Sequence, residues 1–197
     1  TQKPAVVALS AYQQMHIRIN ALQRHGLRLA QNPHYAIQTP HFLRIAALIM
    51  VSVISISTAN GEINELGKKI NAQIIPADAT SLEDLEALFT QSMEVLGGQL
   101  DFVLHSIGMS VNVRKGREYT NQNYDWTMKG LDVSALSFHK VLQTAKKQDA
   151  LNEWGSVIAL TYIAAQKVFP DYNDMADNKS YLESIARSFG YHYGKEK

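Results

Sequence analysis

From residue 61 onward, hydrophobic and polar positions follow two alternating patterns, one helical and one short and continuous. Residues 62–72 carry apolar side chains at helical spacing and predict a helix, and the apolar run at 73–77 predicts a short buried strand. Ser81, followed by acidic residues, predicts the N-cap of a helix that Gly97 and the next glycine end. Residues 100–105 (LDFVLH) then predict a second strand.

The same alternation continues to the end of the sequence. A long apolar pattern predicts a helix over 124–147, residues 155–161 predict a third strand, and 173–189 predict a last helix. Strands that alternate with helices in this way are typical of βαβ units and a parallel sheet, so the fold class is α/β. Ligands bind such sheets at the carboxyl ends of the strands, so the polar residues that follow each strand become candidate site residues.

Composition excludes several classes of protein. The 197 residues are 46% hydrophobic and 19% charged, which excludes a disordered chain or a fibrous repeat. The absence of cysteine excludes disulfides, thiolate metal ligands and a cysteine nucleophile, and it fits the cytoplasm, where we expect the protein. A net charge of +1 gives no case for a nucleic-acid partner. The longest apolar stretch, residues 45–56, is shorter than the roughly 20 residues that span a bilayer, so we expect no membrane segment.

Residues 1–60 differ in character from the rest of the chain. They contain five basic residues, no acid and a single glycine, Gly26. Three interpretations stay open: a transit peptide, a basic nucleic-acid arm, or a segment that was not selected to fold with the remainder. Their four histidines lack a metal-ligand spacing, so no metal site is predicted. We expect this segment to be the least ordered part of the protein and treat it as separate from a domain over 61–197.

The strongest candidate for chemistry is a tyrosine and a lysine near the start of the last predicted helix. Tyr172 and Lys179 are seven residues apart, which is two helical turns, so the sequence predicts that they share one helix face. An adjacent ammonium favours the phenolate and lowers the pKa of a phenol, which suits proton donation to a developing enolate or alkoxide. The same spacing also occurs by chance in many helices, so a structural interpretation stays open.

Three segments resemble a known family. These are LDFVLHSIGMS (100–110), LTYIAAQKVFPDYNDMADNK (160–179) and SYLESIARSFGYHYG (180–194). They are similar to the NADH-dependent enoyl-acyl carrier protein reductases, divergent members of the short-chain dehydrogenase/reductase superfamily. Ordinary members of the superfamily place a serine about 13 residues before the tyrosine, where this chain has Ala159. Tyr162 instead matches the second tyrosine of the enoyl reductases, which separates this chain from ketoacyl reductases and sugar dehydrogenases.

The resemblance implies a Rossmann-like sheet, incomplete at both ends, and a role for each matched residue. Tyr172 would hydrogen-bond the thioester carbonyl, Lys179 would hold the nicotinamide ribose, and Tyr162 would line the acyl pocket and handle a proton. The implied cofactor is NADH, the substrate is an enoyl-acyl carrier protein of type II fatty acid synthesis, and the assembly is a homotetramer. The implied catalytic residues are Tyr162, Tyr172 and Lys179; the cofactor-binding residues are Asp78, Ala79, Ser106, Ile107, Gly108 and Lys179; and the substrate-binding residues are Ser110, Tyr162 and Tyr172.

The chain also departs from this family. Residues 1–60 lack the family's glycine-rich turn, the sequence ends before its nicotinamide loop, and it begins at Thr1, which fits a fragment or a processed product. A displaced reading frame is one hypothesis for residues 1–60. The family often has a motif such as Asn-Asp-Met-x-x-Ala-Trp just after its glycine turn. Codons for that motif, read in a displaced frame, can yield the pattern Gln-Arg-His-x-x-Arg-Leu that residues 23–29 show. In the superfamily's sheet, two further strands lie in space between the strands that match residues 73–77 and 100–105. Residues 45–56 could supply one of these two strands. The sequence therefore leaves open a working reductase or a non-catalytic chain that keeps its oligomer-forming helices, and it predicts poor catalysis.

Overall fold

The computed structural model describes residues 5–8, 45–48, 65, 67–69 and 72–195. Five strands form one parallel sheet in the order β3-β1-β2-β4-β5. Strands β1 (Ala5–Ala8) and β2 (Ile45–Leu48) lie between β3 (Ala72–Gln73) and β4 (Leu100–His105). The α/β prediction is therefore confirmed, and the first 60 residues supply both strands that the topology requires. The expected disorder of 1–60 concerns residues that lie mostly outside the described ones.

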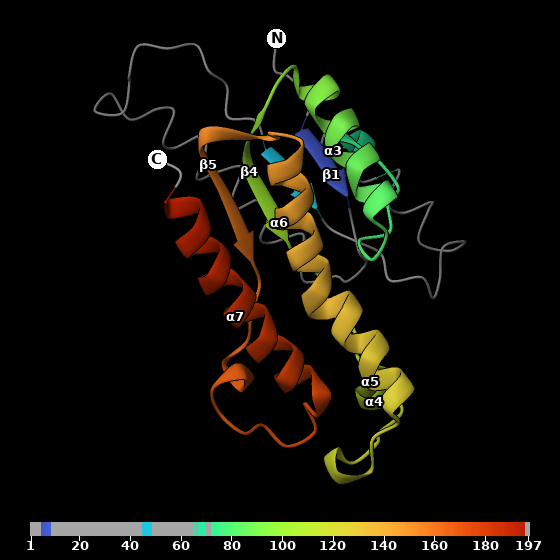
Figure 1. Ribbon diagram of the computed structural model, residues 1–197. Helices are drawn as coiled ribbons and strands as arrows, with labels where there is room; N and C mark the ends of the chain where they lie inside the picture. The colour runs from blue at the N-terminus through green and yellow to red at the C-terminus, as the bar shows by residue number, and fades with distance from the viewer. Residues whose placement is uncertain (1–4, 9–44, 49–64, 66, 70–71, 196–197) are drawn as a thin grey trace, which may run out of the picture.

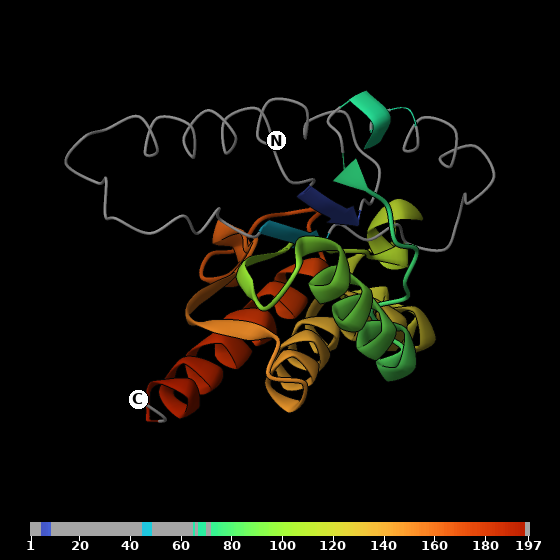
Figure 2. The same cartoon turned by 90° about the horizontal axis from the view of Figure 1, so that it is seen from above.

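Three long helices cover one face of this sheet (Figures 1 and 2). They are α3 (Leu82–Leu96), α6 (Ser137–Lys147) and α7 (Asp174–Gly194). The main core, which includes Leu85, Phe89, Leu100 and Val103, lies between α3, α6 and the sheet. A second apolar cluster joins α6 to α7 through Phe138 and Leu182, among others. This packing fixes α7 beside the end of the sheet.

The helix α3 shows how the local sequence sets the boundaries of an element. The Ser81 hydroxyl accepts a hydrogen bond from the backbone N–H of Asp84 at 3.2 Å, and acids occupy the first turn, as the positive end of a helix dipole favours. At the other end Gly97 has φ 74°, a left-handed conformation that glycine adopts without steric cost. Both predicted ends of this helix are confirmed.

The predicted 124–147 helix is interrupted by a π-helical segment. It runs as α5 (Tyr124–Leu131), the π-helix η3 (Asp132–Leu136) and α6. Within η3, the Ser134 hydroxyl accepts from the N–H of Met109 at 2.8 Å and donates to the carbonyl of the same residue at 2.9 Å. The π-helix thereby holds the segment that follows β4, and its position next to a candidate site is typical of such segments.

Four predicted elements have different boundaries in the structure. The observed strand β3 (Ala72–Gln73) overlaps the predicted strand 73–77 only at Gln73, and Pro76 within the predicted range lacks a backbone donor. Since Ala72 starts β3, it does not end the helix predicted over 62–72. The third strand, β5 (Leu151–Ala159), starts earlier than predicted. The register between β4 and β5 shifts between Leu100 and Phe102 of β4. In this irregular part, a Cβ on Gly155 would lie 3.0 Å from the carbonyl oxygen of Asn152 and 3.0 Å from that of Leu100. The last helix starts one residue later and ends at Gly194 rather than near 189.

Candidate active site at the carboxyl edge of the sheet

A buried histidine ends β4, which lies between β2 and β5 in the sheet. His105 is fully buried; its Nε2 lies 2.9 Å from the Ser137 hydroxyl, and its ring centroid lies 5.1 Å from that of Phe138. Burial, together with the nearby charge of Lys179, lowers the pKa of His105 to about 3, so the ring is neutral at physiological pH. Its Nδ1 has no hydrogen-bond partner among the described residues. We therefore assign His105 a structural role, in which it supports the carboxyl end of β4.

The residues after His105 form the turn predicted to lie under a cofactor. Ile107 is buried in the main core, whereas Gly108 is exposed. A Cβ on Gly108 would lie 3.0 Å from the Met175 Cε and 3.7 Å from the Lys179 Nζ. Glycine therefore leaves open a narrow space between the end of β4 and α7. The side chain of Ile107 faces the core, so its contact with a ligand is left to the backbone.

Lys179 lies in the second turn of α7 and is 6% exposed. Its Nζ donates a hydrogen bond to the carbonyl oxygen of Leu160, just beyond β5, at 2.6 Å. Burial lowers the pKa of Lys179 to about 8, so most molecules carry the ammonium at neutral pH. Leu160 thus links β4 and α7, because its N–H donates to the His105 carbonyl at 3.0 Å while its own carbonyl accepts from Lys179.

The two candidate tyrosines lie against each other. The ring centroids of Tyr162 and Tyr172 are 4.8 Å apart, and Phe169 packs on Tyr162 at 5.2 Å. Tyr162 is 40% exposed and Tyr172 is half-buried, so both rings remain open to a ligand. The structure therefore brings together the two phenols that the sequence singled out.

Two expectations about Tyr172 are wrong. It precedes α7, whose N-cap is Asn173, so it does not share a helical face with Lys179 by periodicity. Its pKa is raised, first by burial and then by Tyr162, whereas an adjacent ammonium was expected to lower it. The physical reason is that the Lys179 ammonium is directed to the Leu160 carbonyl.

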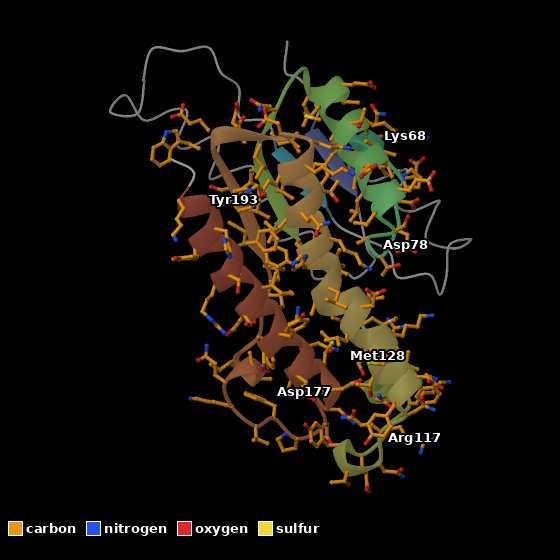
Figure 3. All side chains as sticks on the ribbon, in the orientation of Figure 1. Lys68, Asp78, Arg117, Met128, Asp177 and Tyr193 are labelled. Carbon is orange, nitrogen blue, oxygen red and sulfur yellow. The ribbon has the colours of Figure 1, made fainter. Side chains whose placement is uncertain are left out.

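Asp78 and Ala79 lie in the turn that precedes α3. Figure 3 shows Asp78 next to the start of that helix. Asp78 Oδ1 accepts hydrogen bonds from the N–H and the hydroxyl of Thr80, each at 2.8 Å, and these bonds fix the turn. No hydrogen bond among the described residues uses Asp78 Oδ2, so this oxygen can accept from a ligand. Ala79 is 1% exposed and belongs to the core, so only its backbone could contact a cofactor.

Ser110 has a structural role that the sequence did not indicate. It is the N-cap of α4 (Val111–Arg114) and accepts from the N–H of Val113 at 3.0 Å, while its hydroxyl donates to Asp174 at 2.5 Å. Because the side chain is buried and already engaged, the predicted substrate contact would have to use the backbone.

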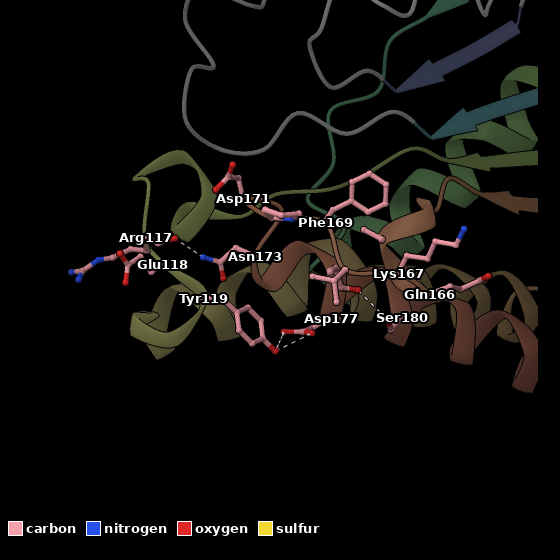
Figure 4. A pocket seen from close by; sticks show the side chains of 14 residues that line it. Arg117, Glu118, Tyr119, Gln166, Lys167, Phe169, Asp171, Asn173, Asp177 and Ser180 are labelled. Carbon is pink, nitrogen blue, oxygen red and sulfur yellow. Dashed lines mark hydrogen bonds between the residues drawn. The ribbon is translucent and has the colours of Figure 1, made fainter.

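A cavity of about 540 Å³ lies near the tyrosine pair, between the segment 164–171 and the turn at 117–119 (Figure 4). At its wall the Tyr119 hydroxyl donates to the Asp177 carboxylate at 3.2 Å. Tyr162, Tyr172 and Lys179 do not line this cavity, and Phe169 is its link to the tyrosine pair. We therefore place the chemistry at the tyrosines and leave the cavity unassigned.

The described residues contain no cluster of three or more metal-ligating side chains. Among the same residues, no helix is long and apolar enough to cross a bilayer. The arrangement thus offers two phenols, one ammonium and a glycine turn at the carboxyl edge of a parallel sheet, which together define a Rossmann-like site. Such a site can hold a nucleotide and give a proton to a developing oxyanion.

The comparison with protein families identifies the group to which this site belongs. The family model described as Enoyl-(Acyl carrier protein) reductase matches residues 42–197, so the chain belongs to this family. The match starts at residue 42, earlier than the 61 that the motifs indicated. The resemblance read from the sequence is confirmed.

Several individual proteins are similar to this chain. Enoyl-[acyl-carrier-protein] reductase [NADH] 1 of Rhizobium meliloti is 34% identical over 110 residues, which are 56% of this chain and 39% of that protein. FabI of Bacillus subtilis is 28% identical over 123 residues, 62% of this chain and 46% of the relative. The chain thus spans about half the length, or less, of the curated relatives it matches.

Solved structures give the same picture. The crystal structure of FabI from Alistipes finegoldii has a TM-score of 0.70 and 55% identity, and the match covers 78% of this chain and 57% of that one. The FabI–NADH complex from the same organism has a TM-score of 0.71 and 55% identity, with 78% and 53% covered. The Rossmann-like fold class is confirmed.

Proposed function

We propose that the chain carries the proton-handling part of an NADH-dependent enoyl-acyl carrier protein reductase site. The observation that carries this proposal is the pair of contacting phenols, Tyr162 and Tyr172, in the same region of the sheet edge as the buried Lys179. Membership of the family and the names of the relatives support the substrate, an enoyl thioester on a carrier protein. The same relatives and the Alistipes finegoldii complex support NADH.

Two features of the structure fit a nucleotide cofactor. The space at Gly108, which a Cβ would fill, lies within reach of the Lys179 Nζ. The ammonium shows one hydrogen bond among the described residues, to Leu160, so its other hydrogens can bind ribose hydroxyls. We infer that Lys179, the Ser106–Gly108 turn, Asp78 and the backbone of Ala79 hold the cofactor. A bound nicotinamide would supply the hydride for reduction of the alkene.

The residues of this chain then act on the other end of the alkene system. When the β-carbon of an enoyl thioester is reduced, negative charge develops on the thioester oxygen, and a positioned donor stabilises it. Tyr172 is the donor in this proposal, because burial keeps its phenol protonated at neutral pH. Tyr162 packs against that phenol and, from its exposed position, lines the acyl chain in this proposal. We further infer a homotetramer in the cytoplasm, with α5–α6 and α7 as the oligomer-forming helices.

Two measurements test this proposal. NADH is first titrated by its fluorescence, and its oxidation is then followed at 340 nm with a crotonyl thioester at saturating NADH. Tyr172→Phe should lower turnover by about 10²- to 10⁴-fold, the usual range for a positioned general acid, without weakening NADH binding. Equal turnover by the variant would contradict the role of Tyr172.

One observation favours a second candidate, a non-catalytic chain that keeps its assembly helices. Gly26 is the sole glycine of residues 1–60, whereas pyrophosphate-binding turns need several glycines for close backbone approach. Absence of saturable NADH binding would support this candidate, and binding in the micromolar range would exclude it.

A further inference from the structure

A closed ring of hydrogen bonds, buried at Asp174 and partly buried elsewhere, involves Asn173 and Asp174, the two residues that follow Tyr172. Asp174, the first residue of α7, is fully buried, and its carboxylate accepts from the Ser110 hydroxyl at 2.5 Å and from the Asn112 amide at 2.9 Å. The Asn112 amide is also fully buried and accepts from the N–H of Asn123 at 3.0 Å while donating to Thr127 at 2.9 Å. One carboxylate thereby joins the segment after β4 to the starts of α5 and α7.

The ring returns to the residue next to Tyr172. The Thr127 hydroxyl donates to Gln122 at 2.9 Å, and the Gln122 amide donates to the Asn173 Oδ1 at 2.6 Å. The same Oδ1 accepts from the N–H of Asp174 at 2.7 Å, which closes the ring. The Asn173 amide also donates to the carbonyl of Arg117 at 2.6 Å, as Figure 4 shows.

The backbone on both sides of Tyr172 is strained. Asp171 has φ 69°, and Asn173 has φ 47° with ψ −139°, a combination that residues with a Cβ rarely adopt. Such conformations are energetically unfavourable and persist where the surroundings determine them. Asn173, which is 6% exposed, has both side-chain polar atoms bound to the ring or to Arg117. The hydrogen-bonded ring therefore fixes the strained backbone that carries the phenol of Tyr172.

We propose that Asp174 is a positioning residue for Tyr172: through Ser110, Asn112 and the Asn173 side chain, it sets the direction in which the phenol points. This inference rests on the proposed function only for its effect on turnover. Its effect on the phenol itself can be measured without substrate. Asp174 does not touch the reacting atoms, and an asparagine at this position could accept from only one of its two present donors.

The test uses the full chain labelled with [¹³Cζ]tyrosine, with the Tyr172 signal assigned from its absence in Tyr172→Phe. Asp174→Asn should move or broaden this signal and bring the Tyr172 pKa closer to 10. Asn173→Gly, which relieves the strain and removes the side-chain bonds, should broaden it as well. Asp125→Asn is the matched control, since it makes the same change in the first turn of α5 at an exposed carboxylate. It should leave the Tyr172 signal unchanged.

Turnover gives the second readout. Asp174→Asn should lower kcat by about 10- to 100-fold with a KM for the enoyl thioester within about threefold, as expected for a misdirected donor. If Asp174→Asn does not fold, Ser110→Ala replaces it as the test variant, because it removes one donor and keeps the Asp174 carboxylate. Ser110→Ala should lower kcat by a smaller factor. An unchanged Tyr172 signal in folded Asp174→Asn, or in Ser110→Ala if that variant must be used, would overturn the proposal. A shifted signal without any NADH oxidation by the wild type would instead support the positioning and overturn the proposed function.

Discussion

Removal of the buried charge at Lys179 should stabilise the protein at neutral pH. The ordinary pKa of 10.5 and the folded-state pKa of about 8 differ by an amount that corresponds to roughly 3 kcal/mol. Lys179→Met removes this cost but leaves the Leu160 carbonyl without its donor, a loss of about 1–3 kcal/mol. We therefore expect the variant to unfold with a free energy about 1 kcal/mol higher than the wild type at pH 7.

The sign of the effect changes with pH. Below pH 8 the lysine is charged in both states, so the wild type bears the full cost of burying the ammonium. Between pH 8 and 10.5 the unfolded chain binds more protons than the folded one, so this group raises the free energy of unfolding as pH rises. At pH 10 roughly 1 kcal/mol of the cost remains, because the unfolded lysine is still mostly charged. The wild type should therefore become more stable than Lys179→Met by up to about 2 kcal/mol near pH 10, since the neutral amine still donates to Leu160.

Urea unfolding at several pH values between 7 and 10 measures this difference. Exposed Lys129→Met is the matched control, because it removes a lysine charge that lies outside the core. A difference between wild type and Lys179→Met that stays constant over the whole series would refute the reasoning, since it would show that the ammonium costs nothing to bury.

Three further predictions concern acid stability, helix capping and the core. The folded-state pKa of His105, about 3, lies below its ordinary 6.5, so its contribution to stability is complete above pH 6.5 and is lost as pH falls toward 3. His105→Gln should flatten this loss, which amounts to roughly 3 kcal/mol in unfolding measured from pH 7 to 4. Ser81→Ala removes the N-cap of α3 and should lower the free energy of unfolding by about 1 kcal/mol, whereas Ser81→Asp should retain it. Phe89→Ala empties a site that is 1% exposed and should cost about 3–5 kcal/mol by urea unfolding; a loss below 1 kcal/mol would contradict the core assignment.

The sequence predicted well those elements whose signals are local. The ends of α3 follow from Ser81 and Gly97, because a cap is a contact between neighbours in the chain. The strand 100–105 follows from a bounded apolar run. The β5 boundary was missed, because the register shift depends on packing between β4 and β5, and sequence spacing does not contain that information.

The site was predicted as a set of residues, but its geometry was not. Tyr162, Tyr172 and Lys179 do lie at one sheet edge, as motif spacing indicated. The expected ammonium–phenol contact failed, because Lys179 found a carbonyl beyond β5 that no local pattern reveals. The ring through Asp174 and Asn112 was missed for the same reason, since its hydrogen bonds join residues up to 64 positions apart. The available signal was an asparagine before an acid-bearing first turn, which indicates a cap and nothing more.

The raised pKa of Tyr172 changes which half of an acid–base role this residue can fill. A phenol whose pKa lies above 10 is protonated at neutral pH, so it can donate to an oxyanion but cannot act as a base there. Donation becomes effective only if the phenol already points at the position where charge develops, since reorientation during the reaction would cost the advantage of a fixed donor. In the positioning that we propose, the strained peptides at Asp171 and Asn173, and the hydrogen-bonded ring that holds Asn173, supply that fixed direction. In the proposed function the lysine therefore need not activate the tyrosine electrostatically: burial and positioning provide a competent donor, and the Lys179 ammonium is left to bind the cofactor.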